Sequence, residues 1–475
     1  MPVGIGATGQ RRENDSMGPV DVPADRYWGA QTQRSLIHFG RIGGDGGEDL
    51  MPREVYHALG HVKKAAALAN GDAGRLPGWM ADLIARVADE VIDGKLDDHF
   101  PLRVWQTGSG TQSNMNVNEV ISNRAIQLLG GPLGSKAPVH PNDHVNMGQS
   151  SNDTFPTAMH IAAVRAVRAN LLPNVTALRE AIAGKARQWR DVVKIGRTHL
   201  QDAVPLTVGQ EWSGYASQLE QAIGGLKAST EGLLELAVGG TAVGTGLNAP
   251  PGFGEAVVER IREQTGYPFR IAKNSFAALA ASDALASASA GLRGLAVPLI
   301  KIANDIRWLA SGPRAGLGEL VLPANEPGSS IMPGKVNPTQ CEAMLMVCAQ
   351  VLGHDSAIAS AASQGNLELN TMRPLIISNF LHSARILAGA TEAFTTFCVA
   401  GAELNRDAVA GYVDRSLMLV TALSPVIGYD KAAEIAHKAN REGTTLREAA
   451  LGLGHISAGD FDRVIDPTSM VGDTG

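Results

Sequence analysis

Apolar residues recur every three or four positions over most of the chain, which is the spacing of amphipathic helices. The pattern predicts helices between residues 49 and 98, with breaks at Gly71 and at Leu76–Gly78, and one helix after Thr111. Longer periodic stretches follow at residues 154–190, 207–238, 275–311, 338–364 and 374–402. The chain is therefore expected to be all-α.

The five long stretches predict a bundle of unusual length. At 1.5 Å per residue, a stretch of about 30 residues would form a helix about 45 Å long, against a usual length of about 11–12 residues. Several are apolar around much of their circumference, as at Met344–Val347. Such helices are buried on more than one side. One chain has too little surface to cover five of them, so we expect subunits to associate.

The chain of 475 residues is too long for one compact core. We expect a disordered tail at 1–16, an N-terminal domain at 17–152, a central long-helix domain at 153–405 and a small helical C-terminal domain at 406–475. Two helix starts are marked by sequence. Thr207–Gln210 has the pattern of a capping box, and Asn337 precedes Pro338 as an N-cap residue precedes proline at N1.

Composition narrows the class of protein. Aromatic residues are only 5% of the chain and alanine is abundant, which favours closely packed helices. The net charge of −6 gives no reason to expect a nucleic acid or an anionic membrane as a partner. Cys341, Cys348 and Cys398 lie in apolar helical stretches, so we expect structural thiols and no disulfide framework. Neither a membrane span nor a secretory signal is predicted, and the expected location is the cytoplasm.

Four polar segments, punctuated by glycine or proline, lie beside the long helices. They are Thr107–Asn114, His140–Asp153, Gly196–Gln201 and Gly328–Pro338. Hydroxyls, amides, a lysine and the free N–H groups of helix starts are what bind carboxylate oxygens, so the segments suggest a carboxylate site. None of them has the ligand spacing of a catalytic metal site, and no phosphate-binding glycine motif is present.

The Gly328–Pro338 segment resembles the signature loop of the fumarase/aspartase superfamily. The other three segments resemble the superfamily's remaining conserved regions, in the same order, and Asp25–Ser35 and Ile427–Ala433 extend the match to nearly the whole chain. Pro333–Gln340 and His140–Asp143 are most similar to the class II fumarases. This resemblance implies a three-domain fold whose long helices form the core of a homotetramer. It also implies a lyase of the tricarboxylic acid cycle that hydrates fumarate to L-malate reversibly and stereospecifically, without metal or cofactor.

The resemblance also implies roles for single residues. Ser329 would take the C3 proton of malate, and His199 would be the other acid/base group, acting through a water molecule. Lys335 would stabilise the aci-carboxylate, and Glu342 would orient His199. The substrate-binding residues would be Ser109, Gly110, Thr111, Ser150, Ser151, Asn152, Thr198, Ser330, Val336 and Asn337. A second, non-catalytic dicarboxylate site would comprise His140, Pro141, Asn142 and Asp143.

In the superfamily each active site draws on three chains. By resemblance, residues 109–114 and 150–152 would come from one chain, 198–199 from a second and 329–342 from a third. Arg197 and Arg373 are interpreted as structural arginines. An ammonia-lyase acting on aspartate, another superfamily lyase that releases fumarate, and a non-catalytic structural homologue remain as alternatives. The placement of the cysteines disfavours an iron–sulfur fumarase.

Overall fold

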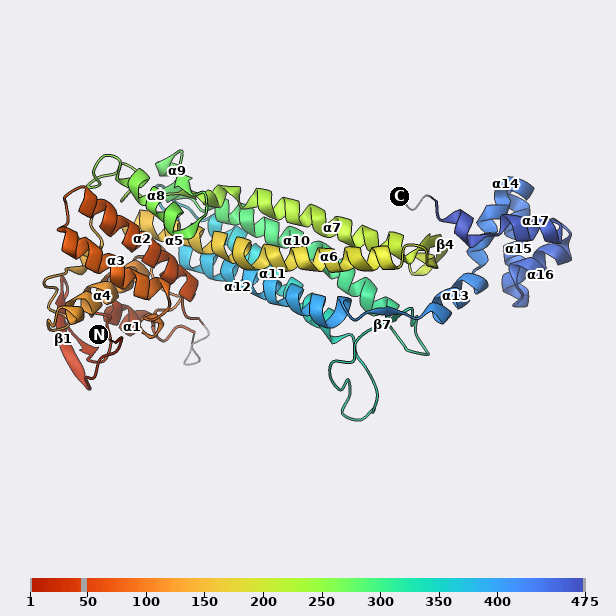
Figure 1. The fold of residues 1–475 in the computed structure, drawn as a ribbon, viewed down its shortest axis with the longest axis horizontal. Coiled ribbons are helices and arrows are strands. Elements are labelled where there is room, and N and C mark those ends of the chain that lie inside the picture. The colour runs from red at the N-terminus through yellow and green to blue at the C-terminus, as the bar shows by residue number, and fades with distance from the viewer. Residues whose placement is uncertain (1, 44–48, 473–475) are drawn as a thin grey trace. The chain divides into compact units, whose positions relative to one another are not determined.

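The computed structural model describes residues 2–43 and 49–472 (Figure 1). The chain forms two compact units. The first comprises residues 1–172, 225–294 and 349–386, and the second comprises residues 173–224, 295–348 and 387–475. Helices α7, α10, α11 and α12, whose bounds follow, contribute residues to both units.

The described residues are mostly helical. The α-helices are α1 (Ala30–Phe39), α2 (Arg53–Asp72), α3 (Gly78–Ile92), α4 (Thr111–Leu128), α5 (Ser151–Arg165), α6 (Leu172–Gln188), α7 (Val208–Ser229), α8 (Phe253–Thr265), α9 (Ser275–Ala280), α10 (Asp283–Leu309), α11 (Thr339–Ala362), α12 (Arg373–Phe394), α13 (Arg406–Arg415), α14 (Ser424–Ile427), α15 (Tyr429–Glu442), α16 (Leu446–Leu453) and α17 (Ala458–Val464). The 3₁₀ segments are η1 (Asp97–His99), η4 (Glu231–Leu234), η6 (Leu417–Leu423) and η7 (Pro467–Met470). The π segments are η2 (Pro141–Val145), η3 (Ala166–Leu171) and η5 (Thr395–Val399).

Short strands supplement the helices in four two-stranded sheets of the described chain. They are β1 (Gln10–Asp15) with β2 (Gly18–Pro23), β3 (Val193–Thr198) with β4 (Gln201–Thr207), β5 (Glu235–Leu236) with β6 (Arg270–Ile271), and β7 (Leu320–Val321) with β8 (Glu403–Leu404). The β5–β6 pair is parallel and the other three are antiparallel.

The core of the first unit is built around α2, which packs against α3, α5 and α8. Figure 1 shows α2 and α3 side by side. The fully buried residues Val55, Leu59, Val62 and Ala66 form the stripe that the helical period predicts. The second unit has a separate apolar cluster that includes Ile195, Leu423, Ile435 and Phe461.

The predicted long helices are confirmed with local differences. From Ser151 to Gln188, α5, η3 and α6 follow one another without a gap. The stretch predicted at 374–402 forms α12 and η5, which end at Val399. The stretch predicted at 207–238 ends as an α-helix at Ser229. The Thr230 hydroxyl donates to the carbonyls of Leu226 and Lys227, and a 3₁₀ turn follows. The stretch predicted at 275–311 is divided into α9 and α10 by extended backbone at Ala281.

The capping box at the start of α7 is confirmed. The Gln210 N–H donates to Thr207 Oγ1 at 3.0 Å, and the Thr207 N–H donates to Gln210 Oε1 at 2.8 Å. The disordered tail predicted at 1–16 requires correction, because residues 10–15 form β1. Arg11 anchors this strand: its guanidinium pairs with Glu13 at 2.7 Å and donates to the Pro23 carbonyl at 2.8 Å.

Helices α10 and α11 are long and apolar enough to cross a membrane, by length and composition. In the single chain, 56% of the most apolar window of α10 is buried, but only 28% of that of α11. Exposed apolar side chains include Val297 and Trp308 on α10 and Met346 and Leu352 on α11. An exposed apolar surface of this kind is typical of an interaction site, and the apolar pattern of the sequence predicts that subunits associate there.

Candidate functional site

The first group of predicted site residues lies at the start of α4. Gly110 precedes the helix with φ of +79°, and a Cβ atom there would lie 2.3 Å from the Phe155 ring, so only glycine fits. Ser109 Oγ and Thr111 Oγ1 are 2.7 Å apart, and the Gln106 side chain caps the helix by accepting the Ser113 N–H at 3.1 Å. The helix start therefore presents two hydroxyls at the positive end of the helix dipole.

The second group lies at the start of α5, in the same unit. Ser150 and Asp153 form a capping box, and Asn152 Nδ2 donates to the Ala242 carbonyl at 2.8 Å. Asn114 of α4 joins the two groups, because its Nδ2 donates to Ser151 Oγ at 2.8 Å. The structure thus brings segments 109–114 and 150–152 together as the sequence predicted, and the two helix starts form one polar cluster. We call residues 109–114 and 150–152 the carboxylate cluster, because the sequence predicts that they bind a carboxylate of the substrate.

Charged side chains are buried near the carboxylate cluster, and the sequence interpretation did not assign them to the site. Lys63 of α2, Asp153 of α5 and Arg373 of α12 are fully buried. Arg373 NH1 donates to the Asn152 carbonyl, and Asp153 Oδ2 accepts the N–H groups of Gly239 and Thr241. Burial lowers the pKa of Lys63 to about 7 and that of Arg373 to about 10. Burial raises the pKa of Asp153 to about 6.

The signal for Lys63 was present in the sequence. It stands four residues after Leu59 and one after Val62, inside the apolar stripe of α2, where lysine is seldom found. For Arg373 the signal was weaker, since its position at the start of a long helix is equally typical of a structural ion pair.

The segment between β7 and α11 carries Ser329 in a tight turn. Ser329 Oγ accepts the backbone N–H groups of Ile331 at 3.3 Å and Met332 at 3.1 Å. Two N–H donors at one hydroxyl oxygen favour its deprotonated form, because hydrogen bonds to the charged form stabilise it. The arrangement can therefore support a serine alkoxide acting as a base.

The ends of this turn are tied together. The Gly328 N–H donates to the Lys335 carbonyl at 3.0 Å, and a Cβ atom at Gly328 would lie 2.3 Å from that oxygen. Asn337 Nδ2 donates to the Gly328 carbonyl at 2.6 Å. The amide of Asn337 thus closes the loop, and the N-cap role predicted for it is not what the structure shows, since α11 begins at Thr339. Ser330, Lys335 and Val336 are exposed on the loop.

His199 lies at the tip of the β3–β4 hairpin. His199 and Leu200 are the two central residues of the turn, with φ of +57° and +61°, the sign that a type I′ turn requires. Neither is glycine, so the left-handed conformation costs about 1–2 kcal/mol for each residue. Strain of this kind persists where the surroundings impose it and is concentrated at functional sites.

A buried network of ion pairs anchors strand β3 of the hairpin. Lys194 Nζ lies 2.8 Å from Glu319 Oε2 and 2.9 Å from Glu211 Oε1, and Arg197 NH1 lies 2.6 Å from Glu319 Oε1. Lys194 and Glu319 are each 2% exposed. Glu319 immediately precedes β7, so one carboxylate connects the hairpin that carries His199 to the root of the loop that carries Ser329. Arg197 is thus a structural arginine, as predicted.

The predicted second dicarboxylate site lies at the π segment η2. His140 Nδ1 accepts the N–H groups of Asn142 at 3.2 Å and Asp143 at 3.1 Å, so the imidazole caps the turn. The His140 N–H donates to His144 Nδ1 at 2.9 Å. Pro141 is buried, whereas Asn142 and Asp143 are exposed. Burial lowers the pKa of His140.

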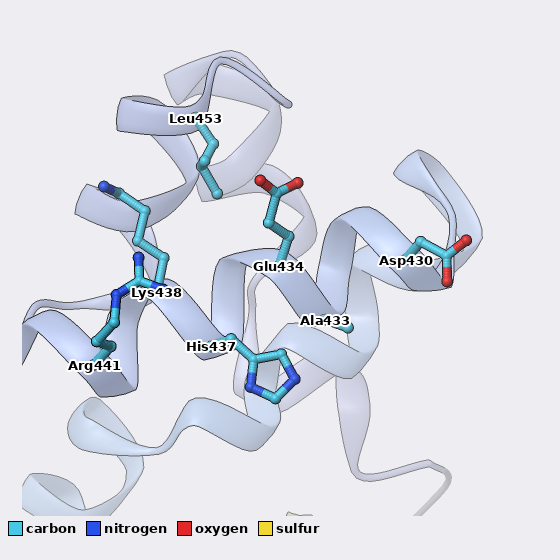
Figure 2. A pocket seen from close by; sticks show the side chains of 7 residues that line it. All are labelled: Asp430, Ala433, Glu434, His437, Lys438, Arg441 and Leu453. Carbon is cyan, nitrogen blue, oxygen red and sulfur yellow. The ribbon is translucent and has the colours of Figure 1, made fainter.

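The predicted residues fall into separate groups. The carboxylate cluster belongs to the first unit, and the hairpin tip and the loop belong to the second. Within the second unit, no hydrogen bond or ion pair among the described residues links His199 to the loop or to Glu342. A pocket along α15, closed on one side by Leu453 (Figure 2), contains none of the predicted residues. Its lining comprises Asp430, Ala433, Glu434, His437, Lys438, Arg441 and Leu453.

In the part of the chain that the structure describes, no group of three or more His, Cys, Asp or Glu side chains is arranged to hold a metal ion. Cys341, Cys348 and Cys398 are buried free thiols. Burial raises the pKa of the Cys348 thiol to about 12, so the thiol is protonated at neutral pH.

Comparison with known protein families gives two matches. The family described as "Lyase" matches residues 18–353, and the family described as "Fumarase C C-terminus" matches residues 419–472. Together they cover most of the chain, including every predicted site residue, but not Arg373 or Cys398.

The chain is similar over its full length to named proteins. It is 66% identical to a "Fumarate hydratase class II" of Methanosarcina acetivorans, over 100% of this chain and 97% of the relative. It is 59% identical to a protein of the same name from Thermosynechococcus vestitus, over 98% and 99% of the two chains. Among solved structures, a class II fumarase from Schistosoma mansoni matches with a TM-score of 0.94 and 46% identity, over 98% and 99% of the two chains.

Proposed function

The chain belongs to the class II fumarate hydratase family and catalyses the hydration of fumarate to malate, and from this premise we propose how its residues perform the reaction. The observation that carries the proposal is the pair of backbone N–H groups, from Ile331 and Met332, at Ser329 Oγ. A serine is a poor base unless its alkoxide is stabilised, and these two donors stabilise it.

In the direction from L-malate, the Ser329 alkoxide takes the proton from C3. The electron pair left on C3 spreads into the adjacent carboxylate as a doubly negative aci form, which needs donors and positive charge placed in advance. Ser330, Lys335, Val336 and Asn337 of the loop hold that carboxylate. The hydroxyl at C2 then leaves as water with a proton that His199 supplies through a bound water molecule, and Glu342 orients His199. Fumarate, neutral imidazole and the serine hydroxyl remain, and the reaction uses no metal or cofactor.

The other carboxylate is held by the carboxylate cluster. Ser109, Gly110, Thr111, Ser150, Ser151 and Asn152 supply polar contacts at the positive ends of two helix dipoles. Thr198, next to His199 on the hairpin, also contacts this carboxylate. A fixed carboxylate orients C2 and C3 between the base and the acid.

The site is assembled from three chains of a homotetramer. Residues 109–114 and 150–152 come from one chain, 198–199 from a second and 329–342 from a third. Two observations support this assignment: His199 has no bond to Glu342 or the loop within the described chain, and α10 and α11 expose apolar side chains. Those helices are covered by the equivalent helices of other subunits and not by lipid, and the enzyme works in the cytoplasm. The three-domain boundaries at residues 17–152, 153–405 and 406–475 belong to the same proposal.

Ser329→Ala tests the role of the base. The alanine cannot take a proton, so kcat should fall by a factor of about 10²–10⁴, as expected for loss of general base catalysis, with dicarboxylate affinity nearly unchanged. Fumarate absorbance in the ultraviolet measures kcat, and calorimetric titration with succinate measures affinity. Ser330→Ala is the matched comparison, because loss of a carboxylate contact should raise KM more than it lowers kcat. Turnover of Ser329→Ala within threefold of the wild type would remove Ser329 from the role of base.

A further inference from the structure

Lys63 is a fully buried lysine without a carboxylate partner. Its Nζ donates to Asn146 Oδ1 and Gln149 Oε1, both at 2.9 Å, and both acceptors are neutral amides. No Asp or Glu oxygen of the described residues lies within 4.0 Å of Lys63 Nζ, the distance that defines an ion pair. The next residue, Lys64, is partly exposed and pairs with Asp89 at 2.7 Å.

A buried ammonium without a counter-ion is costly, because transfer of a charge out of water is repaid only by a nearby opposite charge. The neighbourhood does not balance it. Two buried basic groups, Lys63 and Arg373, face one buried carboxylate, Asp153, so a protonated Lys63 leaves a surplus of one positive charge. Burial lowers the pKa of Lys63 to about 7, and Asp153 offsets only part of that effect.

The ammonium is connected to the carboxylate cluster through one amide. Asn146 Oδ1, which accepts from Lys63, also accepts from Asn114 Nδ2 and Asn118 Nδ2, both at 3.2 Å. Asn114 in turn donates to Ser151 Oγ at 2.8 Å. Lys63 therefore fixes the amide that orients Asn114, and a chain of three hydrogen bonds connects its ammonium to Ser151 Oγ.

We infer that Lys63 is a positioning residue that makes the carboxylate cluster selective for dianions, the bound substrate carboxylate being the counter-ion that the protein itself does not supply. The inference rests on the proposed carboxylate site. The field of a buried charge is screened far less than that of a surface charge, so Lys63 acts on the ligand without touching it. A carboxylate at the cluster gains from this field, whereas a neutral amide there gains nothing. Succinamate places its one carboxylate against Lys335 and the loop, so its amide faces the cluster.

Lys63→Met removes the charge and retains most of the side-chain volume. We expect the inhibition constant of succinate to rise on the order of tenfold, and that of succinamate, which has one charge fewer, to change less than threefold. KM for fumarate should rise by a factor similar to that of the succinate inhibition constant, and kcat should fall by a smaller factor. Lys64→Met is the matched control and should leave all three constants unchanged, because Lys64 is partly exposed and paired with Asp89.

Lys63→Gln separates charge from hydrogen bonding, because glutamine keeps two N–H donors and loses the ammonium. It should show the same loss of preference for the dianion as Lys63→Met, and it also serves if the methionine variant does not fold. Equal weakening of succinate and succinamate in Lys63→Gln, or wild-type binding of succinate by it, would overturn the inference. Thr111→Val tests the underlying site separately: if it leaves succinate binding unchanged, the proposed cluster is wrong whatever the Lys63 variants show.

Discussion

Ser329 and His199, the two side chains that move protons in the proposal, are both held by unusual backbone. Ser329 Oγ is enclosed by two N–H donors from the residues just after it, which sets its chemistry locally. His199 occupies a left-handed turn position that histidine adopts only at a cost. Ser329 is thus held by its own segment, whereas the turn fixes only the backbone of His199, and in the proposal Glu342 orients its ring.

His140 is held differently, since its ring is used as a helix cap. His140→Asn should retain much of the cap, because asparagine is among the preferred N-cap residues. If His140–Asp143 is a second, non-catalytic dicarboxylate site, the variant should keep kcat within about twofold and lose a weak second class of succinate binding in calorimetric titration. A large fall in kcat would instead place this turn in the active site.

Single residues could be assigned to the site from the sequence only where they stand in a recognisable motif. Ser329, His199 and Asn152 were assigned to the site because they stand in segments of recognisable order and composition. Lys63 was missed because a lysine within a helical stripe carries no local motif, and its isolation from carboxylates depends on how α2, α4 and α5 pack. The part played by Asn337 was mistaken because the sequence favours an N-cap, whereas in the folded loop its amide bonds to Gly328.

Among the elements, the β3–β4 hairpin and the loop before α11 share a root. Glu319 accepts bonds from Lys194 and Arg197 of β3, and it immediately precedes β7, from which the loop starts. In the proposal, the hairpin serves one active site and the loop of the same chain serves another. The network therefore fixes the relative placement of two elements that act in different sites.

Glu319→Gln should disturb the hairpin more than an ordinary surface change. It leaves Arg197 without its carboxylate and Lys194 with Glu211 alone, and breaking a buried pair in this way costs about 3–5 kcal/mol. We expect a lower midpoint in urea unfolding at fixed protein concentration, together with a lower kcat. Glu434→Gln provides a control, because its carboxylate pairs with His455 at an exposed position of α15. An unchanged midpoint for Glu319→Gln would show that the network does not support the fold.

The elements themselves were predicted unevenly. Long helices follow from a period that repeats over many residues, so their presence was predicted well, whereas their ends and the break at Ala281 were not. The hairpin escaped prediction because its turn lacks the Asn-Gly or Asp-Gly pair that usually marks a two-residue turn. His199 and Leu200 occupy the turn instead. Turn propensities do not predict a turn at residues that disfavour the left-handed conformation.

For the molecule as a whole, the proposed division of the site among chains has a direct test. Asn152→Ala lacks a contact in the carboxylate cluster and Ser329→Ala lacks the base, so each homotetramer should be weakly active. When the two are denatured and renatured together in equal amounts, about a quarter of the sites combine an intact cluster from one chain with an intact loop from another. Activity should then rise to about that fraction of wild type. Activity no higher than that of the separate variants would mean that each site lies within one chain.

In the proposed assembly, the apolar outer surface of α11 affects the protein before any site exists. A freshly translated subunit meets water with Met346 and Leu352 uncovered. The rate at which subunits associate depends on their concentration. At a low concentration, unassembled chains persist for longer and can aggregate with unrelated proteins or occupy chaperones. The rate of synthesis in the cell therefore governs the proportion of chains that mature, as well as their number.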